Sequence, residues 1–442
     1  MNLKDLAQMA VDSAMKAGAE WADATVSQVL HVGVELEKSS IRECEVVREY
    51  GIGVRAFNRG GVGTATADRH DEESVRECGV QAAALARATH GDPDFVELPG
   101  PKPFEDVPGL FCDKVAGLHA AEAVRWCQMA INEANEVSPE VTLAGGAGFS
   151  VGDHATVTST GVVFGRAGTL VDMSMQAVVR TDDDAGSYFE FDVARRLEDF
   201  VPEGIGRMAA TEALRYLGSQ HVNTERLTLV LGPMAAQDLI GSAIGAANAE
   251  SIQRQRSYLI GKERERIAAE CITVWEEPFV PAGLMSAGCD GEGQPKVRRA
   301  LIDQGVLTTF LHNSYTANKA KVPTTAHGAR GGAGVGIGTS NLQVARGDKT
   351  EAELIAEVDN GIYINSAGIQ PDAVSGDVSA TIDFGFKIEN GKLAYPVQTT
   401  MIGSDIFEML ANIDAVSSDY REEPGSIFPS LRLTGIQVVG GK

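Results

Sequence analysis

Apolar and polar residues alternate along much of the N-terminal part of this chain. Between residues 24 and 36 every second position is mainly apolar, which predicts a half-buried strand. Residues 51–57 and 61–67 flank the turn residues 58–60, and this pattern predicts a β-hairpin. Other predicted strands share flanking turn residues: 41–47, a run of short strands within 141–179, 271–275, a hairpin over 301–307, a hairpin over 383–397 around Asn390-Gly391, and 431–439.

Apolar residues three or four positions apart predict helices in the intervening segments. Asp71 can cap one of these helices, and Val75, Cys78, Ala82 and Leu85 form its predicted buried stripe. The other predicted helices are 3–17, 114–136, 203–217, 351–358, 404–411 and a charged helix around 263–265. Strands and helices are grouped along the chain rather than alternating, which favours an α+β fold over a doubly wound sheet.

The centre of the chain carries an apolar run followed by a helix of small residues. Residues 227–231 predict a buried strand, and Gly232-Pro233 ends it, with Pro233 suited to the first turn of a helix. The predicted helix continues to about residue 250. Its interior glycines, Gly241 and Gly245, each cost about 1 kcal/mol relative to alanine, so they predict close packing or an active site there.

Two boundaries divide the chain. Five prolines fall between residues 91 and 108, which predicts a stiff, extended linker. Residues 218–224 form the second boundary. We therefore expect an N-terminal α+β region, 1–222, whose sub-regions 1–90 and 109–222 flank the linker, and a β-rich α+β domain over 223–442.

Charge and cysteine usage narrow the class of protein. The 442 residues carry a net charge of −23, which repels nucleic-acid phosphates and argues against direct nucleic-acid binding. The six cysteines include no C-x-x-C pair, so they are interpreted as small buried residues of a protein in a reducing compartment. The N-terminus lacks an apolar signal core and no apolar run could cross a bilayer, so we expect a cytoplasmic protein without membrane contact.

The sequence offers few candidate metal-ligating or ligand-binding residues. The closest two histidines are fifteen residues apart, so no helical turn presents a pair of imidazole ligands. Residues 326–338 contain six glycines and predict a loop, in which His327 and Arg330 either bind a carboxylate or peptide backbone or simply face water. Arg254 and Arg256 have two interpretations: they bind a partner protein or an anion, or they lie on a face of the protein that only contacts water.

Several short motifs in a fixed order resemble the TldD/PmbA family, and specifically its PmbA (TldE) branch. The resemblance covers nearly the whole chain and implies a two-domain PmbA/TldD-like architecture with mixed and antiparallel sheets and flanking helices. The motifs that carry it include Gly51-Ile52-Gly53-Val54-Arg55, Arg256-Ser257-Tyr258-Leu259, Cys289-Asp290-Gly291-Glu292-Gly293, Gly305-Val306-Leu307, Ser314-Tyr315-Thr316-Ala317, Thr325-Ala326-His327-Gly328, Ile388-Glu389-Asn390-Gly391 and Tyr395-Pro396-Val397.

The same resemblance implies that a metal site is missing. The TldD branch carries H-E-x-x-x-H on the helix after the central strand and a further Cys ligand near the C-terminus. Alignment on residues 256–259 places Ile240-Gly241 at the His-Glu pair and Gly245 at the second His. None of these side chains can coordinate zinc, and residues 417–442 contain no cysteine. We therefore expect no catalytic residue, no metal ligand and no cofactor in this chain.

The resemblance implies a non-catalytic subunit of a cytoplasmic zinc metalloprotease complex that processes unfolded or leader peptides. Its partner would be a TldD-like protease subunit that holds the zinc, in a heterodimer, with a homodimer as the assembly when that partner is missing. The alternative is a stand-alone peptide-binding or chaperone-like protein without a protease partner. The family's older description as a modulator of DNA gyrase suggests a third role, which the charge of −23 argues against.

Overall fold

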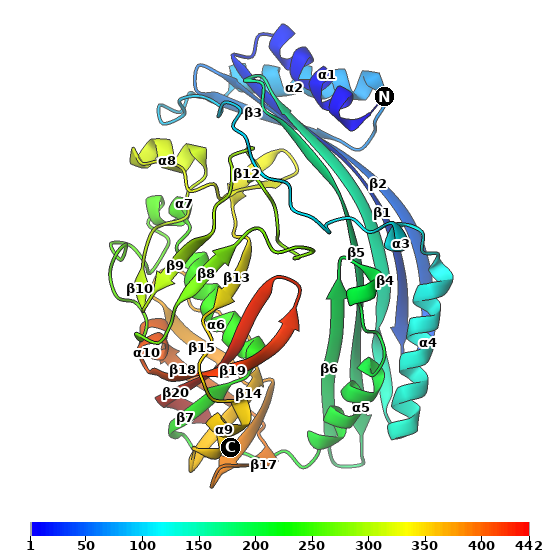
Figure 1. The fold of residues 1–442 in the computed structure, drawn as a ribbon, viewed down its shortest axis with the longest axis vertical. Coiled ribbons are helices and arrows are strands. Elements are labelled where there is room, and N and C mark those ends of the chain that lie inside the picture. The colour runs from blue at the N-terminus through cyan, green and yellow to red at the C-terminus, as the bar shows by residue number, and fades with distance from the viewer. Residues whose placement is uncertain (1, 442) are drawn as a thin grey trace.

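A computed structural model describes residues 2–441 and contains two sheets that face each other (Figure 1). The N-terminal sheet is antiparallel throughout, with strand order β3-β2-β1-β4-β5-β6. Its strands are β1 (Trp21–Glu37), β2 (Ser40–Asn58), β3 (Gly61–Ala67), β4 (Thr142–Thr158), β5 (Val163–Arg180) and β6 (Ala185–Ala194). Strands on both sides of the proline-rich segment therefore join one sheet, because β1 pairs with β4 along fourteen residues.

Helices cover the outer face of this sheet in two groups (Figure 1). One group packs against the first strands at one end and contains α1 (Leu3–Lys16) and α2 (Glu72–Ala88). The other group contains α3 (Asp113–Ala116), α4 (Ala120–Val137) and α5 (Ile205–Arg215). These helices pack against β4, β5 and β6, and their buried side chains form a second hydrophobic cluster. Asp71 caps α2 as predicted, because its side chain accepts the Ser74 backbone N–H. No helix or strand lies between α2 and α3, which agrees with an extended proline-rich segment.

The C-terminal half is built on a twelve-stranded mixed sheet, and this confirms the predicted α+β fold class. Strand β7 pairs parallel to β14 and antiparallel to β20, and the helices of this half pack around these strands. The sheet contains β7 (Glu225–Leu231), β8 (Val274–Glu277), β9 (Arg299–Asp303), β10 (Val306–Leu307), β13 (Asn341–Val344), β14 (Asn360–Ser366), β15 (Asp377–Thr381), β16 (Phe384–Glu389), β17 (Lys392–Pro396), β18 (Thr400–Asp405), β19 (Ile413–Glu423) and β20 (Ser426–Gly440). Its helices are α6 (Pro233–Ala246), α7 (Ala249–Gln253), α8 (Ser314–Ala320), α9 (Glu351–Ala356) and α10 (Ile406–Ala411).

Several local predictions are wrong. Residues 41–57 lie in one long strand, and 141–179 form two long strands rather than several short ones, because glycines within a sheet interior need not end a strand. Leu85 is 50% exposed, because alanines form the buried stripe of α2. Residues 263–265 form turns rather than a helix, and Cys44 and Cys271 are exposed rather than buried.

The glycine-rich segment 326–338 is a hairpin rather than an irregular loop. Strand β11 (Gly328–Gly331) pairs antiparallel with β12 (Gly334–Ile337), and Gly332 turns between them with a φ of 56°. A glycine adopts this left-handed conformation at low cost. The hairpin leaves the C-terminal half and reaches the N-terminal sheet, since a Cβ added to Gly53 of β2 would lie 2.6 Å from the Gly332 carbonyl oxygen.

The outer half of β2 has no neighbouring strand on one side. Strand β3 pairs only with residues 52–58, so residues 40–51 are paired with β1 alone. All of residues 40–50 are exposed except Val47, which is half-buried. The described residues include no helix long and apolar enough to cross a membrane.

Candidate functional site

A large cleft lies between the concave face of the N-terminal sheet and the C-terminal half, with a volume of about 1550 Å³. Its floor comes from side chains that alternate along four strands and therefore share one face of the sheet. Many of these floor residues are small or polar, such as Thr25, Ser27, Gly53, Ser150, His154 and Gly168, although Val29, Phe164 and Leu170 also line the cleft. Because few large side chains stand on this floor, the space above the sheet stays open.

Apolar side chains line the walls of the cleft. Phe104 and Phe111 come from the segment that joins α2 to α3, and Met285 comes from the C-terminal half. Their exposed fractions are 36%, 41% and 57%, which are high for such large apolar residues. Exposed apolar residues that gather in a concave site are typical of ligand-binding surfaces.

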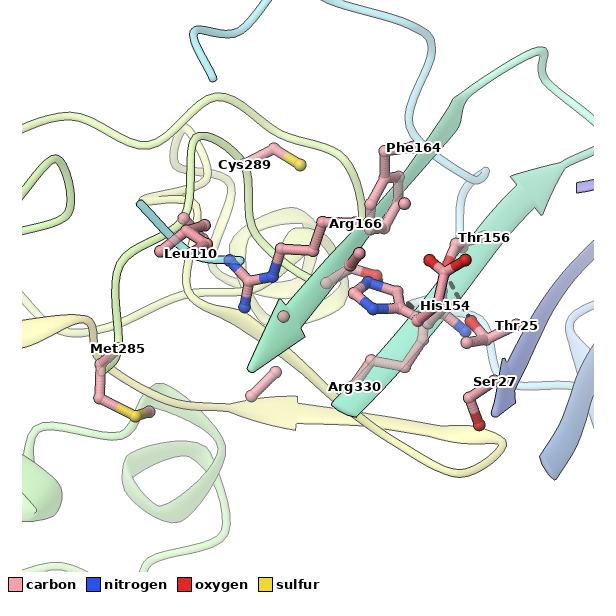
Figure 2. A pocket seen from close by; sticks show the side chains of 18 of the residues that line it. Thr25, Ser27, Leu110, His154, Thr156, Phe164, Arg166, Met285, Cys289 and Arg330 are labelled. Atoms are coloured by element: carbon pink, nitrogen blue, oxygen red, sulfur yellow. Dashed lines mark hydrogen bonds between the residues drawn. The ribbon is translucent and has the colours of Figure 1, made fainter. Parts of the chain in front are cut away.

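Two arginines connect the sheet to the C-terminal half across the cleft. Arg166 leaves β5, and Figure 2 shows it extending toward Leu110 and Cys289. Its Nη1 donates to the Ser286 carbonyl at 2.6 Å. Arg195 follows β6, and its Nε donates to the Gly283 carbonyl at 3.0 Å. These contacts hold the turn 283–286 against the sheet.

A buried carboxylate joins the glycine-rich hairpin to the sheet. Asp23 on β1 is fully buried, and Arg55 on β2 grips it through Nε at 3.0 Å and Nη2 at 2.6 Å. Arg330 on β11 donates to the same carboxylate at 2.9 Å. Burial raises the pKa of Asp23, but the charges and hydrogen bonds of Arg55 and Arg330 outweigh it and lower the pKa to about 2. Arg330 is therefore a buried link between the two halves.

The acidic motif at 289–293 stands beside this hairpin. Asp290 is buried, and its carboxylate accepts backbone N–H groups from Glu292, Gln294 and Gly328 at 2.8–2.9 Å. Burial and the neighbouring Glu292 charge raise the pKa of Asp290 to about 6. Glu292 in turn accepts the Ser314 N–H at the start of α8 at 2.7 Å. These carboxylates accept hydrogen bonds from the backbone, which offsets part of the cost of burying them.

His327 also lies in the interior rather than on a flexible loop. Its side chain is 0% exposed, and Nε2 lies 2.8 Å from Glu276 Oε2. Lys296 and the Ser340 N–H approach the other oxygen of Glu276 at 3.3 and 2.7 Å. Burial raises the pKa of Glu276, but His327, Lys296 and Ser340 outweigh it and lower the pKa to about 2. The structure thus gives His327 an internal carboxylate partner.

The two remaining arginine candidates are far less enclosed. Arg254 is exposed and pairs with Glu250 at 2.7 Å, four residues earlier on α7. Arg256 is exposed just beyond α7. Neither residue lines the cleft described above, whereas Arg330 does. Of the four candidate residues, the structure therefore places only Arg330 at this cleft.

Helix α6 does not offer the residues that zinc requires. Ile240 is 0% exposed within the C-terminal core, whereas a Cβ added to Gly241 or Gly245 would meet no atom within 4 Å. The expected close packing at the two glycines is therefore wrong. Residues 2–441 also contain no group of three His, Cys, Asp or Glu side chains suited to a metal.

Sequence reasoning missed Asp23, Arg166 and Arg195. Their roles depend on contacts with residues far away in the chain, such as the 307 positions between Asp23 and Arg330. One usable signal was present at Arg166, because strand alternation puts it on the same face as Phe164 and Gly168. That face has no apolar run, so an arginine on it could point into an open space.

Three family models match successive parts of the chain. They are PmbA/TldA metallopeptidase domain 1 over residues 22–86, the central domain over 113–217 and the C-terminal domain over 224–440. Among curated proteins, Metalloprotease PmbA of Escherichia coli O157:H7 is 23% identical over 444 residues, covering 99% of this chain and 97% of that protein.

Solved structures share the whole fold. A protein from Bacteroides thetaiotaomicron, described as a proposed modulator of DNA gyrase, is 26% identical with a TM-score of 0.90 and 99% of both chains covered. TldE from Thermococcus kodakarensis is 22% identical with a TM-score of 0.89, covering 98% of this chain and 100% of that chain. These matches extend the similarity across both halves of the chain.

Proposed function

This chain belongs to the PmbA/TldD family, and on that premise we propose that it is the non-catalytic subunit of a zinc metalloprotease complex that processes peptides. A TldD-like subunit supplies the zinc, and this chain supplies a wall of the space that receives an unfolded or leader peptide. We also place the complex in the cytoplasm, which agrees with six free cysteines.

The observation that carries this proposal is the chemistry of α6. A zinc site needs nitrogen, sulfur or oxygen ligands from side chains that converge on one point. Positions 240, 241 and 245 provide one buried aliphatic side chain and two glycines. A polarised scissile carbonyl and an activated water therefore have no source on this helix, and a partner must provide them.

The cleft supports the peptide-binding part of the proposal. An extended peptide needs an open channel with apolar patches for side chains and polar groups for its backbone. The cleft has both, because Phe104, Phe111 and Met285 stand above a floor with many small or polar residues. The same geometry would serve a stand-alone peptide-binding protein, so association with a partner is the property that separates the two functions.

The test is purification of the chain alone and after co-expression with the TldD-like protein of the same organism. We expect a stable complex by size-exclusion chromatography with light scattering, with zinc and peptide cleavage only in the complex. The isolated chain should contain no more than trace zinc by mass spectrometry of the metal. Stoichiometric zinc together with peptide cleavage in the isolated chain would refute the proposal.

A designed variant tests the argument from α6 directly. Gly241 and Gly245 are four residues apart, so both point to the same open side of the helix. The double substitution Gly241→His and Gly245→His should create an i,i+4 histidine pair that binds Ni²⁺ or Zn²⁺ in a calorimetric titration. The wild-type chain should show no such binding, and metal binding equal in both proteins would contradict the assignment of an empty face.

A further inference from the structure

Arg166 is a cation in the cleft without an acidic partner. Its guanidinium has five N–H donors, and the Ser286 carbonyl accepts one of them. Arg166 makes no ion pair with any carboxylate in residues 2–441, whereas Arg55 and Arg330 both pair with Asp23. Most of the Arg166 donors are therefore free to bind a ligand.

Arg195 adds a second positive charge near Arg166, in a cleft whose lining also includes Asp106, Asp153 and Asp290. Arg195 stands nearby and also lacks a carboxylate partner among the described ion pairs, although its donors bind the carbonyls of Gly283, Leu284 and Thr169. Burial and the charge of Arg166 lower the pKa of Arg195 to about 10, which indicates that the two cations repel each other. His154 is paired across the strands with Arg166, and burial together with the Arg166 charge lowers its pKa, so the imidazole is neutral at pH 7. An anion beside Arg166 would reduce this repulsion.

The apolar walls restrict what kind of anion fits. Phe104, Phe111 and Met285 line the same cleft as Arg166 and leave large apolar areas uncovered. A small inorganic anion would leave these side chains in contact with water. A carboxylate attached to an apolar residue would neutralise the guanidinium and cover the apolar side chains in one binding event.

We propose that the cleft binds a peptide through a carboxylate held by Arg166, with a neighbouring apolar side chain packed against Phe104, Phe111 and Met285. This inference rests on the proposed function and specifies which class of peptide the cleft binds. The carboxylate belongs either to the peptide C-terminus or to an acidic side chain, and both sources present the same planar pair of oxygens to the guanidinium. If Arg166 only clamps the turn at Ser286, peptides with and without a carboxylate would bind equally.

The experiment measures binding of fluorescein-labelled decapeptides to the isolated full chain by fluorescence anisotropy. Three peptides end in leucine: a free acid, its C-terminal amide, and an amide that carries an internal aspartate. A charge-assisted hydrogen bond predicts about tenfold tighter binding of a carboxylate-bearing peptide than of the plain amide. Preference for the free acid identifies the C-terminus as the source, and preference for the aspartate peptide identifies a side chain.

Substitutions assign the preference to specific residues. Arg166→Gln should bring the affinity ratio of acid to amide to about one while leaving amide binding unchanged, and Arg166→Lys should keep part of the preference. Met285→Ala should weaken all three peptides and leave the ratio unaltered. Arg48→Gln, at an exposed arginine on the outer half of β2, is the matched control and should change neither quantity. Circular dichroism and thermal unfolding establish that each variant is folded.

Two results would overturn the inference: equal affinity of the wild-type chain for all three peptides, or an unchanged ratio in Arg166→Gln. The assay uses no partner subunit, so its outcome is separate from that of the co-expression test. A chain that prefers carboxylate peptides but never associates with a TldD-like subunit would refute the proposed function alone. A chain that forms the zinc-containing complex but shows no preference would refute this inference alone.

Discussion

Replacement of Asp23 by asparagine should destabilise the fold more than any surface charge substitution. Asp23 is fully buried and balances two guanidinium groups, one from β2 and one from the hairpin that leaves the C-terminal half. Asparagine keeps the shape but removes the charge, so Arg55 and Arg330 would remain in the interior without a counter-ion. Loss of one partner from a buried ion pair typically costs 3–5 kcal/mol.

The pKa of Asp23 gives an independent magnitude. A pKa lowered from 3.8 to about 2 corresponds to about 2.5 kcal/mol of extra stability for the ionised form. Because the pKa is lower in the folded state, this stability is present above about pH 4 and is lost as the pH falls toward 2. We therefore expect Asp23→Asn to cost about 3 kcal/mol at pH 7 and to reduce the loss of stability between pH 4 and pH 2.

Guanidinium chloride unfolding, followed by tryptophan fluorescence, measures this cost, and hydrogen exchange locates it. Exchange should accelerate in residues 328–337, because the hairpin loses its buried anchor. Asp199→Asn is the matched control, since the Arg196–Asp199 pair at 2.6 Å is on the surface, where water screens the two charges and the pair adds little stability. A cost below 1 kcal/mol for Asp23→Asn, with unchanged exchange in the hairpin, would refute the reasoning.

Further predictions test packing and charge elsewhere. Gly53→Val should cost about 1–3 kcal/mol and displace the hairpin, because its Cβ would lie 2.6 Å from the Gly332 carbonyl; hydrogen exchange reports the displacement. Gly241→Ala meets no neighbour within 4 Å, so it should raise stability by up to about 1 kcal/mol in denaturant unfolding. Ile240→Ala should lower stability by about 2–5 kcal/mol in the same assay, because it empties a core position. The stability that Glu276 gains from its lowered pKa should be present above about pH 4.5 and lost toward pH 2, and Glu276→Gln should flatten that part of the pH profile.

Local chemistry made some of the fold predictable. Asn390 and Gly391 both have positive φ in the hairpin between β16 and β17, which is why that dipeptide is a strong turn signal. The same reasoning failed at 328–337, where glycines stand within two paired strands whose turn lies against Gly53 of the N-terminal sheet. Local glycine content therefore predicts tight turns well. It does not separate loops from strands that pack closely against other backbone.

The candidate site was less predictable because its contacts are distant in sequence. His327 and Arg330 were selected from the sequence, but their carboxylate partners, Glu276 and Asp23, were not. Nothing in a linear sequence pairs Arg330 in a glycine-rich segment with Asp23, which lies 307 positions earlier. Burial also decides what a charged residue can do. A charged side chain inside the protein is paired with its counter-ion, whereas Arg166 has no carboxylate partner and remains able to bind a ligand.

The outer half of β2, which has a neighbouring strand on one side only, has a consequence for the solution behaviour of the chain. A long strand edge in contact with water is a template for joining another strand, and so a route to aggregation. Glu43, Glu45 and Glu49 occupy alternate positions and therefore project from one face of this edge. If two copies joined edge to edge in antiparallel fashion, their rows of glutamates would meet on a common face and repel each other. Electrostatic repulsion between these rows of glutamates therefore opposes the joining of identical chains through this edge.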